Sequence, residues 1–196
     1  MGKLWKVVIL IAVIGVMALD IFFDYKAQAH IQPGNSGVDA FANTNIGTSV
    51  GDLAPDFTAE TLEGTTIQLS ELRGKIVVLN LFASWCGPCR AEMPHLVEVS
   101  QEVDPLESTF IGLNFQESPG AVKDFQEEFS IQFPLVLDED GNLTNNLYHP
   151  IGLPTTWFID QDGIVRYVFS GPMSNQTLLK ILSDIQSGQE PDPFGI

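Results

Sequence analysis

Basic residues are scarce in this 196-residue sequence, which has 9 Lys and Arg residues against 25 Asp and Glu residues and a formal net charge of -16. A surface this acidic repels phosphate backbones, so we expect no nucleic-acid partner; the acid excess serves solubility or attracts a basic partner. The sequence also lacks internal repeats and low-complexity tracts. Its length and its 44% share of hydrophobic residues therefore predict one globular domain with an appendage.

Cysteine is scarcer still, since the chain has only Cys86 and Cys89, with Gly87 and Pro88 between them. A tetrahedral zinc site needs four ligands. The other candidate ligands are spread along the chain without a second close pair, at His30, His95 and His149. A structural disulfide stabilises most when it closes a long loop, and only two residues separate this pair. We therefore expect no metal and no separate cofactor, and we interpret the pair as a reversible redox couple.

Residues 1–29 predict a membrane segment, because Lys3 and Lys6 precede an uncharged apolar run at residues 7–19. As an uncleaved anchor, residues 4–23 reach roughly the 20 residues that span a bilayer, and the lysines would keep the amino terminus in the cytoplasm with the domain outside. As a cleaved signal peptide, the segment would be cut near Ala29, which gives a secreted or periplasmic protein. We favour the anchor because an aromatic-rich stretch separates the apolar run from Ala29.

The rest of the chain divides into a linker at residues 30–50, a domain at 51–188 and a tail at 189–196. The linker is rich in Gly, Asn, Ser and Thr and has no sustained period, so we expect a tether. In the domain, the sequence predicts strands at residues 57–60, 65–69, 76–82, 109–115, 135–137, 155–159 and 164–169. It predicts helices that begin near residues 90, 118, 143 and 174. This alternation predicts a mixed sheet flanked by helices, preceded by a β-hairpin.

Two of these helices have a predicted apolar face. The first face consists of Met93, Leu96, Val97 and Val103. The second face consists of Leu178, Leu179, Leu182 and Ile185. Residues 76–82 are almost continuously apolar and rich in β-branched side chains, which is typical of a central strand covered on both faces.

The cysteine pair lies between that central strand and the first long helix. Unpaired N–H groups and the positive end of the helix dipole stabilise a thiolate at such a position. We therefore predict that Cys86 attacks a client disulfide and that Cys89, one turn further on, resolves the mixed disulfide. Trp85 either covers the pair or belongs to ordinary packing, and both interpretations remain open.

The sequence resembles proteins of the thioredoxin fold in two motifs, WCGPC at residues 85–89 after the central strand and GLPTT at residues 152–156. Further motifs are similar to those of membrane-anchored extracytoplasmic TlpA/ResA/DsbE-type thiol-disulfide oxidoreductases, some of which serve cytochrome c maturation. They are APDF at 54–57, RAEMP at 90–94, FPLVLD at 133–138 and the amino-terminal apolar segment. The resemblance covers about residues 50–187.

The resemblance implies a substrate site around a cis proline at Pro154, whose neighbours would offer backbone groups to an extended client. A cis bond is common only before proline, so Pro154 is eligible; the alternative is an ordinary turn proline. On this basis we expect the substrate-binding residues to be Trp85, Gly87, Pro88, Leu153, Pro154 and Thr155.

The resemblance also implies a proton-transfer residue, Glu92, three residues after Cys89. Thioredoxins proper carry a buried acid six residues before the first cysteine, and this sequence departs from them because Asn80 stands there. Burial would raise the pKa of Glu92 toward the operating pH. The alternative is a solvated helix glutamate.

We therefore predict an extracytoplasmic protein-disulfide reductase that receives electrons from a membrane thiol donor, with apocytochrome c as a family-level client. The Gly-Pro dipeptide between the cysteines, as in strongly reducing thioredoxins, favours the reducing direction. One alternative is a peroxiredoxin-like thiol peroxidase, although Ala83 stands where that class usually has threonine. The other is a non-catalytic docking module, which leaves the cysteine spacing unexplained.

Overall fold

The computed structural model describes residues 45–192. The predicted membrane segment, most of the predicted linker and the last four residues of the predicted tail lie outside the described residues. Within the described range, none of the helices combines the length and the apolar character that a membrane crossing requires.

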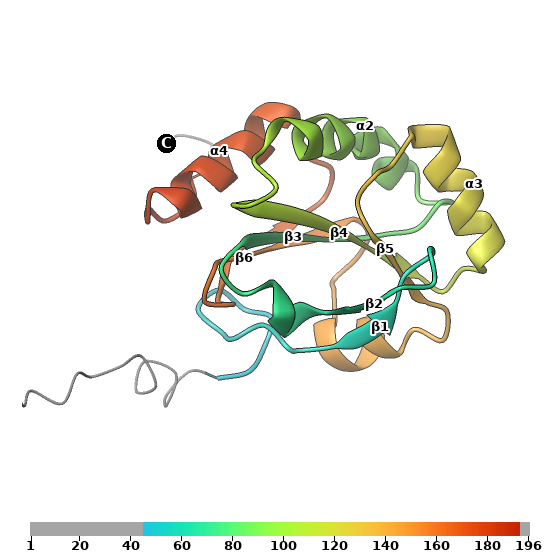
Figure 1. Cartoon of the computed structure of the whole chain (residues 1–196), viewed down its shortest axis with the longest axis horizontal. Coiled ribbons are helices and arrows are strands. Elements are labelled where there is room, and N and C mark those ends of the chain that lie inside the picture. The colour runs from blue at the N-terminus through green and yellow to red at the C-terminus, as the bar shows by residue number, and fades with distance from the viewer. Residues whose placement is uncertain (1–44, 193–196) are drawn as a thin grey trace, which may run out of the picture. The chain divides into compact units, whose positions relative to one another are not determined.

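Five strands form the central sheet in the order β5-β4-β3-β6-β7 (Figure 1). Their bounds are β3 Ile76–Phe82, β4 Ser108–Phe115, β5 Leu135–Asp138, β6 Thr155–Ile159 and β7 Val165–Ser170. β3 pairs in parallel with β4 and antiparallel with β6, so the sheet is mixed. All seven residues of β3 are buried, which confirms the prediction of a central strand covered on both faces.

Three long helices cover one face of this sheet: α2 Gly87–Glu102, α3 Pro119–Phe129 and α4 Asn175–Gln186 (Figure 1). The other face carries an antiparallel strand pair and two short helices, and Figure 1 shows the strand pair opposite α2. These elements are β1 Thr58–Glu60, β2 Thr66–Gln68, the 3-10 helix η1 Leu69–Leu72 and the π-helix η2 Thr144–Tyr148. The observed architecture is the predicted thioredoxin-like α/β fold.

Each face of the sheet has its own hydrophobic core. Met93, Phe125 and Ile181 belong to the core under the three long helices, and Phe57 and Trp157 belong to the core on the other face. Burying a large apolar side chain contributes roughly 1.5–3 kcal/mol, so the two cores hold β3 firmly in place. The elements that flank the cysteine pair are therefore rigid parts of the fold.

The predicted apolar face of α4 was wrong at Leu179, which is 39% exposed, and it omitted Ile181, which is fully buried. Leu178, Ile181 and Leu182 follow the i, i+3, i+4 spacing of one helix face, whereas Leu179 is one residue out of phase. In α2, the prediction omitted Val99, which is buried, whereas the predicted Val97 is half-buried and packs against the core under the three long helices.

Strand register defines the two ends of the sheet. Phe82 of β3 lies opposite Asn114, and Leu81 lies opposite Thr155 at the start of β6. The chain passes from this end of β3 into the cysteine pair, and we call it the cysteine end. At the other end Val77 lies opposite Ile159, directly before the β6–β7 turn; we call this the turn end.

Candidate active site

Cys86 is the N-cap residue of α2, and Gly87 and Pro88 form the beginning of the helix. Proline is tolerated there because the first N–H groups of a helix have no partner within the helix. Cys86 and Cys89 are joined by a disulfide bond, and the Cys89 N–H donates to Cys86 Sγ at 3.2 Å. The Cys86 sulfur therefore lies where a helix terminus stabilises negative charge.

The two sulfur-bearing residues differ in access to solvent. Cys86 is 6% exposed, whereas Cys89 is fully buried. A client can therefore approach Cys86 more readily than Cys89. This difference agrees with the prediction that Cys86 attacks and Cys89 resolves. Trp85 is 67% exposed, so the interpretation of this residue as ordinary packing is wrong. Trp85 directly precedes Cys86 in the sequence, and its side chain is exposed to solvent.

Glu92 is 1% exposed and lies three residues after Cys89, one turn along the same helix. Its Oε1 accepts from Asn80 Nδ2 at 2.7 Å, and its Oε2 accepts from the Met173 N–H at 3.1 Å. Burial raises the pKa of Glu92 to about 7, because desolvation outweighs the two hydrogen bonds, which lower it. The interpretation as a solvated helix glutamate is wrong, and the expected rise of the pKa is confirmed.

Asn80 connects this carboxyl group to the neighbouring strand. Its Nδ2 donates to both Glu92 and Thr156 Oγ1, the latter at 2.8 Å. Its buried Oδ1 has no hydrogen-bond partner among the described residues. Asn80 therefore supplies a neutral donor at the place where thioredoxins proper carry an acid.

The Leu153–Pro154 peptide bond is cis, which confirms the expected conformation. Pro154 directly precedes β6, so strand register places it beside the cysteine end of β3. Two hydrogen bonds fix this segment: Thr155 Oγ1 donates to the Gly152 carbonyl at 2.7 Å, and the Gly171 N–H donates to the Pro154 carbonyl at 2.9 Å. The fold thus brings this segment and the cysteine pair to the same end of the sheet.

Sequence reasoning assigned no role in the site to several residues at this end, namely Thr156, Met173, Ser84, Arg90 and Glu117. Each contributes through a hydrogen bond between segments far apart in sequence, for example Met173 with Glu92 across 81 residues. Most of these residues lie near the end of a predicted strand, but that position does not identify their bonding partners.

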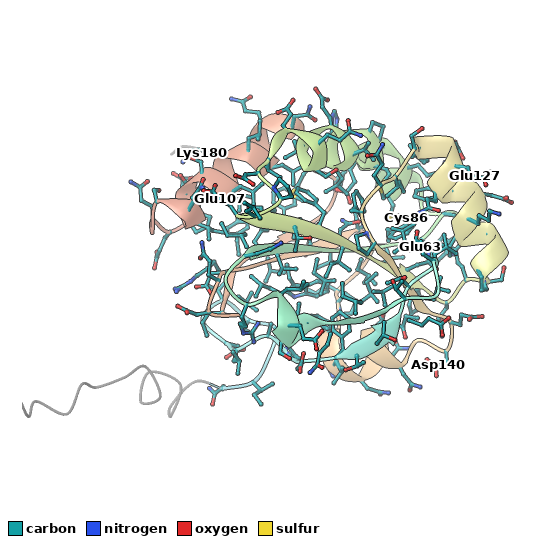
Figure 2. All side chains as sticks on the ribbon, in the orientation of Figure 1. Glu63, Cys86, Glu107, Glu127, Asp140 and Lys180 are labelled. Atoms are coloured by element: carbon teal, nitrogen blue, oxygen red, sulfur yellow. A yellow bond between two sulfur atoms is a disulfide. The ribbon has the colours of Figure 1, made fainter. Side chains whose placement is uncertain are left out.

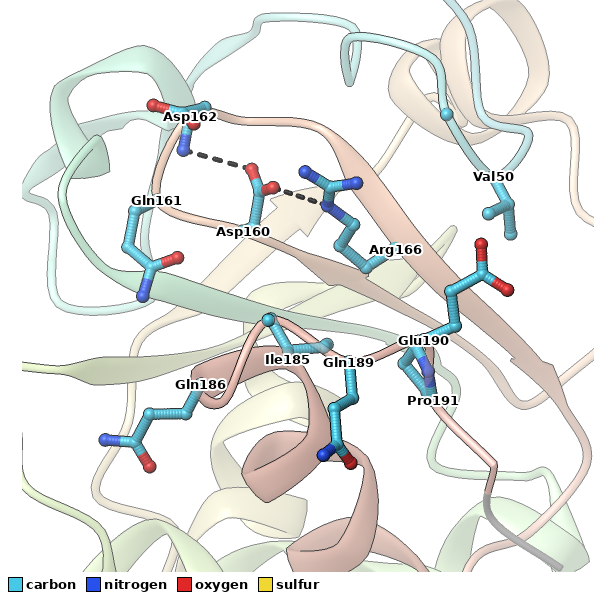
Figure 3. Close-up of a pocket in the computed structure, with 12 residues that line it drawn as sticks. Val50, Asp160, Gln161, Asp162, Arg166, Ile185, Gln186, Gln189, Glu190 and Pro191 are labelled. Carbon is cyan, nitrogen blue, oxygen red and sulfur yellow. Dashed lines mark hydrogen bonds and ion pairs between the residues drawn. The ribbon is translucent and has the colours of Figure 1, made fainter.

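A cavity of about 570 Å³ lies at the turn end of the sheet (Figure 3). Two of the charged side chains that line it, Asp160 and Arg166, are already paired: the Asp160 carboxylate accepts from the Asp162 N–H at 3.0 Å, from the Ile164 N–H at 2.8 Å and from Arg166. The residues that line it include no cysteine or histidine. Residues 45–192 also contain no cluster of three or more His, Cys, Asp or Glu residues that could hold a metal ion.

Comparison with known proteins agrees with this site. Residues 50–168 match the AhpC/TSA family. The thiol-disulfide oxidoreductase ResA of Geobacillus kaustophilus is 34% identical over 146 residues, which cover 74% of this chain and 83% of the relative. ResA of Bacillus subtilis is 33% identical over 141 residues, which cover 72% of this chain and 78% of the relative.

Solved structures agree as well. A thiol:disulfide interchange protein of the thioredoxin family from Chlorobium tepidum has a TM-score of 0.59 and 30% identity, covering 66% of this chain and 92% of that one. A secreted Mycobacterium tuberculosis disulfide oxidoreductase, homologous to Escherichia coli DsbE, has a TM-score of 0.57 and 29% identity, covering 65% and 94%. The chain therefore belongs to the AhpC/TSA family and is a thiol-disulfide oxidoreductase of the ResA and DsbE type.

Proposed function

We propose that this oxidoreductase reduces disulfides in protein clients through Cys86 and Cys89. The observation that carries the proposal is the position of Cys86 at the N-cap of α2, where its sulfur accepts the Cys89 N–H. Trp85, Gly87, Pro88 and residues 153–155 are the proposed client-binding residues.

The reaction proceeds in two exchanges. The Cys86 thiolate attacks one sulfur of the client disulfide; the client S–S bond breaks, a mixed disulfide forms, and the first client thiolate leaves and takes up a proton. Cys89 then loses its proton and attacks Cys86 Sγ, which releases the second client thiolate and forms the Cys86–Cys89 bond. Two electrons pass to the client, and the protein ends oxidised.

Glu92 is the proposed acceptor of the Cys89 proton. Cys89 is fully buried, so bulk water has little access to its thiol. A carboxyl group whose pKa burial raises to about 7 can both accept and release a proton near neutral pH. Asn80 keeps that carboxyl oriented without competing for the proton, because an amide does not ionise in this range.

Continued reduction requires an electron donor, for which we propose a membrane thiol protein. We place the domain outside the cytoplasm, anchored by residues 1–29, on the basis of the apolar run at 7–19 and the two lysines before it. Apocytochrome c is the proposed client class. The Gly-Pro dipeptide between the cysteines supports the reducing direction.

The test is the reduction potential of the full-length protein together with the reduction of a small disulfide-bonded protein such as insulin. A potential near -270 mV supports a reductant, and one near -120 mV contradicts this direction. Cys86→Ser should abolish client reduction, whereas Cys89→Ser should accumulate the mixed disulfide. Full function of Cys86→Ser would instead indicate a docking module.

A thiol peroxidase is the second candidate, because the AhpC/TSA match covers residues 50–168. Ala83, three residues before Cys86, is buried and has no hydroxyl group to orient a peroxide. Mixing the reduced protein with hydrogen peroxide separates the two functions. Slow oxidation relative to client exchange supports the reductase, and rapid stoichiometric oxidation supports the peroxidase.

A further inference from the structure

Ser84 lies two residues before Cys86, and charged side chains bond all three of its polar groups. Glu117 Oε2 accepts from the Ser84 N–H at 2.7 Å, and Glu117 Oε1 accepts from the Ser84 hydroxyl group. Arg90 Nη1 donates to the Ser84 carbonyl oxygen at 3.2 Å. Two side chains, Glu117 and Arg90, therefore hold the loop between β3 and the cysteine pair.

The two charged side chains are themselves fixed by other elements. Glu117 lies in the connection from β4 to α3, is half-buried, and its Oε2 also accepts from Asn114 Nδ2 at 2.7 Å. Asn114 is the β4 residue opposite Phe82, so this bond ties Glu117 to the cysteine end of the sheet. Glu117 is therefore fixed to β4 while its carboxylate bonds to Ser84.

Arg90 connects the same loop to α3. Its guanidinium lies 5.6 Å from the ring centre of Phe125 and 5.2 Å from that of Phe129, and it forms an ion pair with Glu128. Figure 2 shows Cys86 on the side of the molecule that carries α3. The loop is thereby attached to both α3 and β4.

We propose that Glu117 is a positioning residue, which holds the loop of residues 83–86 so that Cys86 stays at the N-cap of α2. Cys86 depends on this loop because its sulfur must meet the Cys89 N–H for the helix terminus to act on it. Without Glu117, the Ser84 N–H and hydroxyl group lose their partners, and the loop can move away from the helix. This inference rests on the proposed function.

The variant Glu117→Gln separates the positioning role of Glu117 from the effect of its negative charge. In Glu117→Gln, the amide oxygen can take the place of Oε2 and accept from both Ser84 N–H and Asn114 Nδ2. The amide nitrogen takes the place of Oε1 and donates to the Ser84 hydroxyl, which can accept as well as donate. All three hydrogen bonds survive while the negative charge is lost.

The experiment measures alkylation of reduced full-length protein by iodoacetamide as a function of pH, and the rate of client reduction. Glu117→Ala should slow both reactions about tenfold at neutral pH and move the alkylation profile to higher pH. Glu117→Gln should stay within about twofold of wild type. Asp124→Ala, which removes an exposed acid from α3, is the matched control and should change neither reaction.

Two results overturn the inference: a Glu117→Ala protein that reacts like wild type, or Glu117→Gln and Glu117→Ala shifting the profile equally to lower pH, as loss of charge alone would. If Glu117→Ala does not fold, Ser84→Ala removes only the hydroxyl bond, and it should slow alkylation in the same direction by a smaller factor. Cys86→Ser tests the proposed function separately, because its loss of activity would persist whatever Glu117 does.

Discussion

Two buried carboxyl groups, one near each end of the central sheet, differ in their bonding partners. At the turn end, Asp160 is 6% exposed and is bonded to the Arg166 cation and to two backbone N–H groups. At the cysteine end, Glu92 is 1% exposed and accepts hydrogen bonds from two neutral donors, Asn80 Nδ2 and the Met173 N–H. At the turn end, the Arg166 cation compensates the charge of Asp160. At the cysteine end, Glu92 has no such cation among its hydrogen-bond donors and can change its protonation near neutral pH.

This contrast indicates that the buried Glu92 carboxyl group lowers the stability of the fold while serving the reaction. Burying a carboxylate without a cation is unfavourable, and such groups favour the neutral form instead. Active sites commonly carry this cost because the reaction needs a proton acceptor with a raised pKa. The cavity at the turn end, although large, lies beside a carboxylate that is already fully engaged.

The largest expected effect is on the pH dependence of stability. The pKa of Glu92 is about 7 in the folded protein and 4.5 ordinarily, so as pH rises through this interval the unfolded state ionises first and stability falls. The oxidised wild type should lose about 3 kcal/mol of unfolding free energy between pH 4 and 8 from this group.

Urea denaturation of oxidised wild type and Glu92→Gln across this range measures the difference. The variant should lack the decline that Glu92 causes in the wild type. Parallel curves for the two proteins would show that folding does not raise the pKa of Glu92 and would remove the contrast between the two ends.

Glu92→Gln should also slow client reduction by about a hundredfold at neutral pH, because it removes the proposed acceptor of the Cys89 proton. The wild-type rate should fall as pH decreases through about 7, where Glu92 becomes protonated. The variant should lose this acidic limb. Stopped-flow measurement of the resolving step checks both, and an unchanged rate with an unchanged profile would exclude Glu92 from proton transfer.

The matched change at the turn end, Asp160→Asn, should reduce stability by about 2 kcal/mol, since it removes the partner of Arg166 and weakens two backbone bonds. Client reduction per folded molecule should stay at the wild-type rate. Thermal unfolding and a turnover assay on the same sample measure the two quantities. A large loss of turnover with intact stability would mean that the turn end takes part in the reaction.

The smallest expected effect comes from Asn80→Ala. The Asn80 hydrogen bond lowers the pKa of Glu92, so its removal should raise that pKa further above the ordinary value. The acidic limb of the pH–rate profile should move to slightly higher pH. Movement to lower pH would show that Asn80 does not stabilise the ionised form.

Local patterns predicted the parts of the site that one segment encodes. The apolar run of β3, the cysteine pair after it and Glu92 one turn into α2 are all visible within residues 76–92. Sequence reasoning also placed the cis proline, through the resemblance to a known family. It misassigned Leu179 because consecutive leucines do not show which one follows the phase of the helix.

The rest of the site depends on contacts between distant segments. Asn80 meets Thr156 across 76 residues, and Ser84 meets Glu117 across 33 residues. Polar and charged residues are common near strand ends, so composition alone does not say which of them pair. Only the strand register, which brings Asn114 opposite Phe82, places Glu117 beside the cysteine loop.

The most direct test of the account is a titration of the Cys86 thiol in reduced full-length Cys89→Ser, followed by the ultraviolet absorbance of the thiolate. Because the sulfur lies at the start of α2 beside a backbone N–H, the titration midpoint should fall well below the value of about 8.5 for a free cysteine. A midpoint at or above that value would contradict the account.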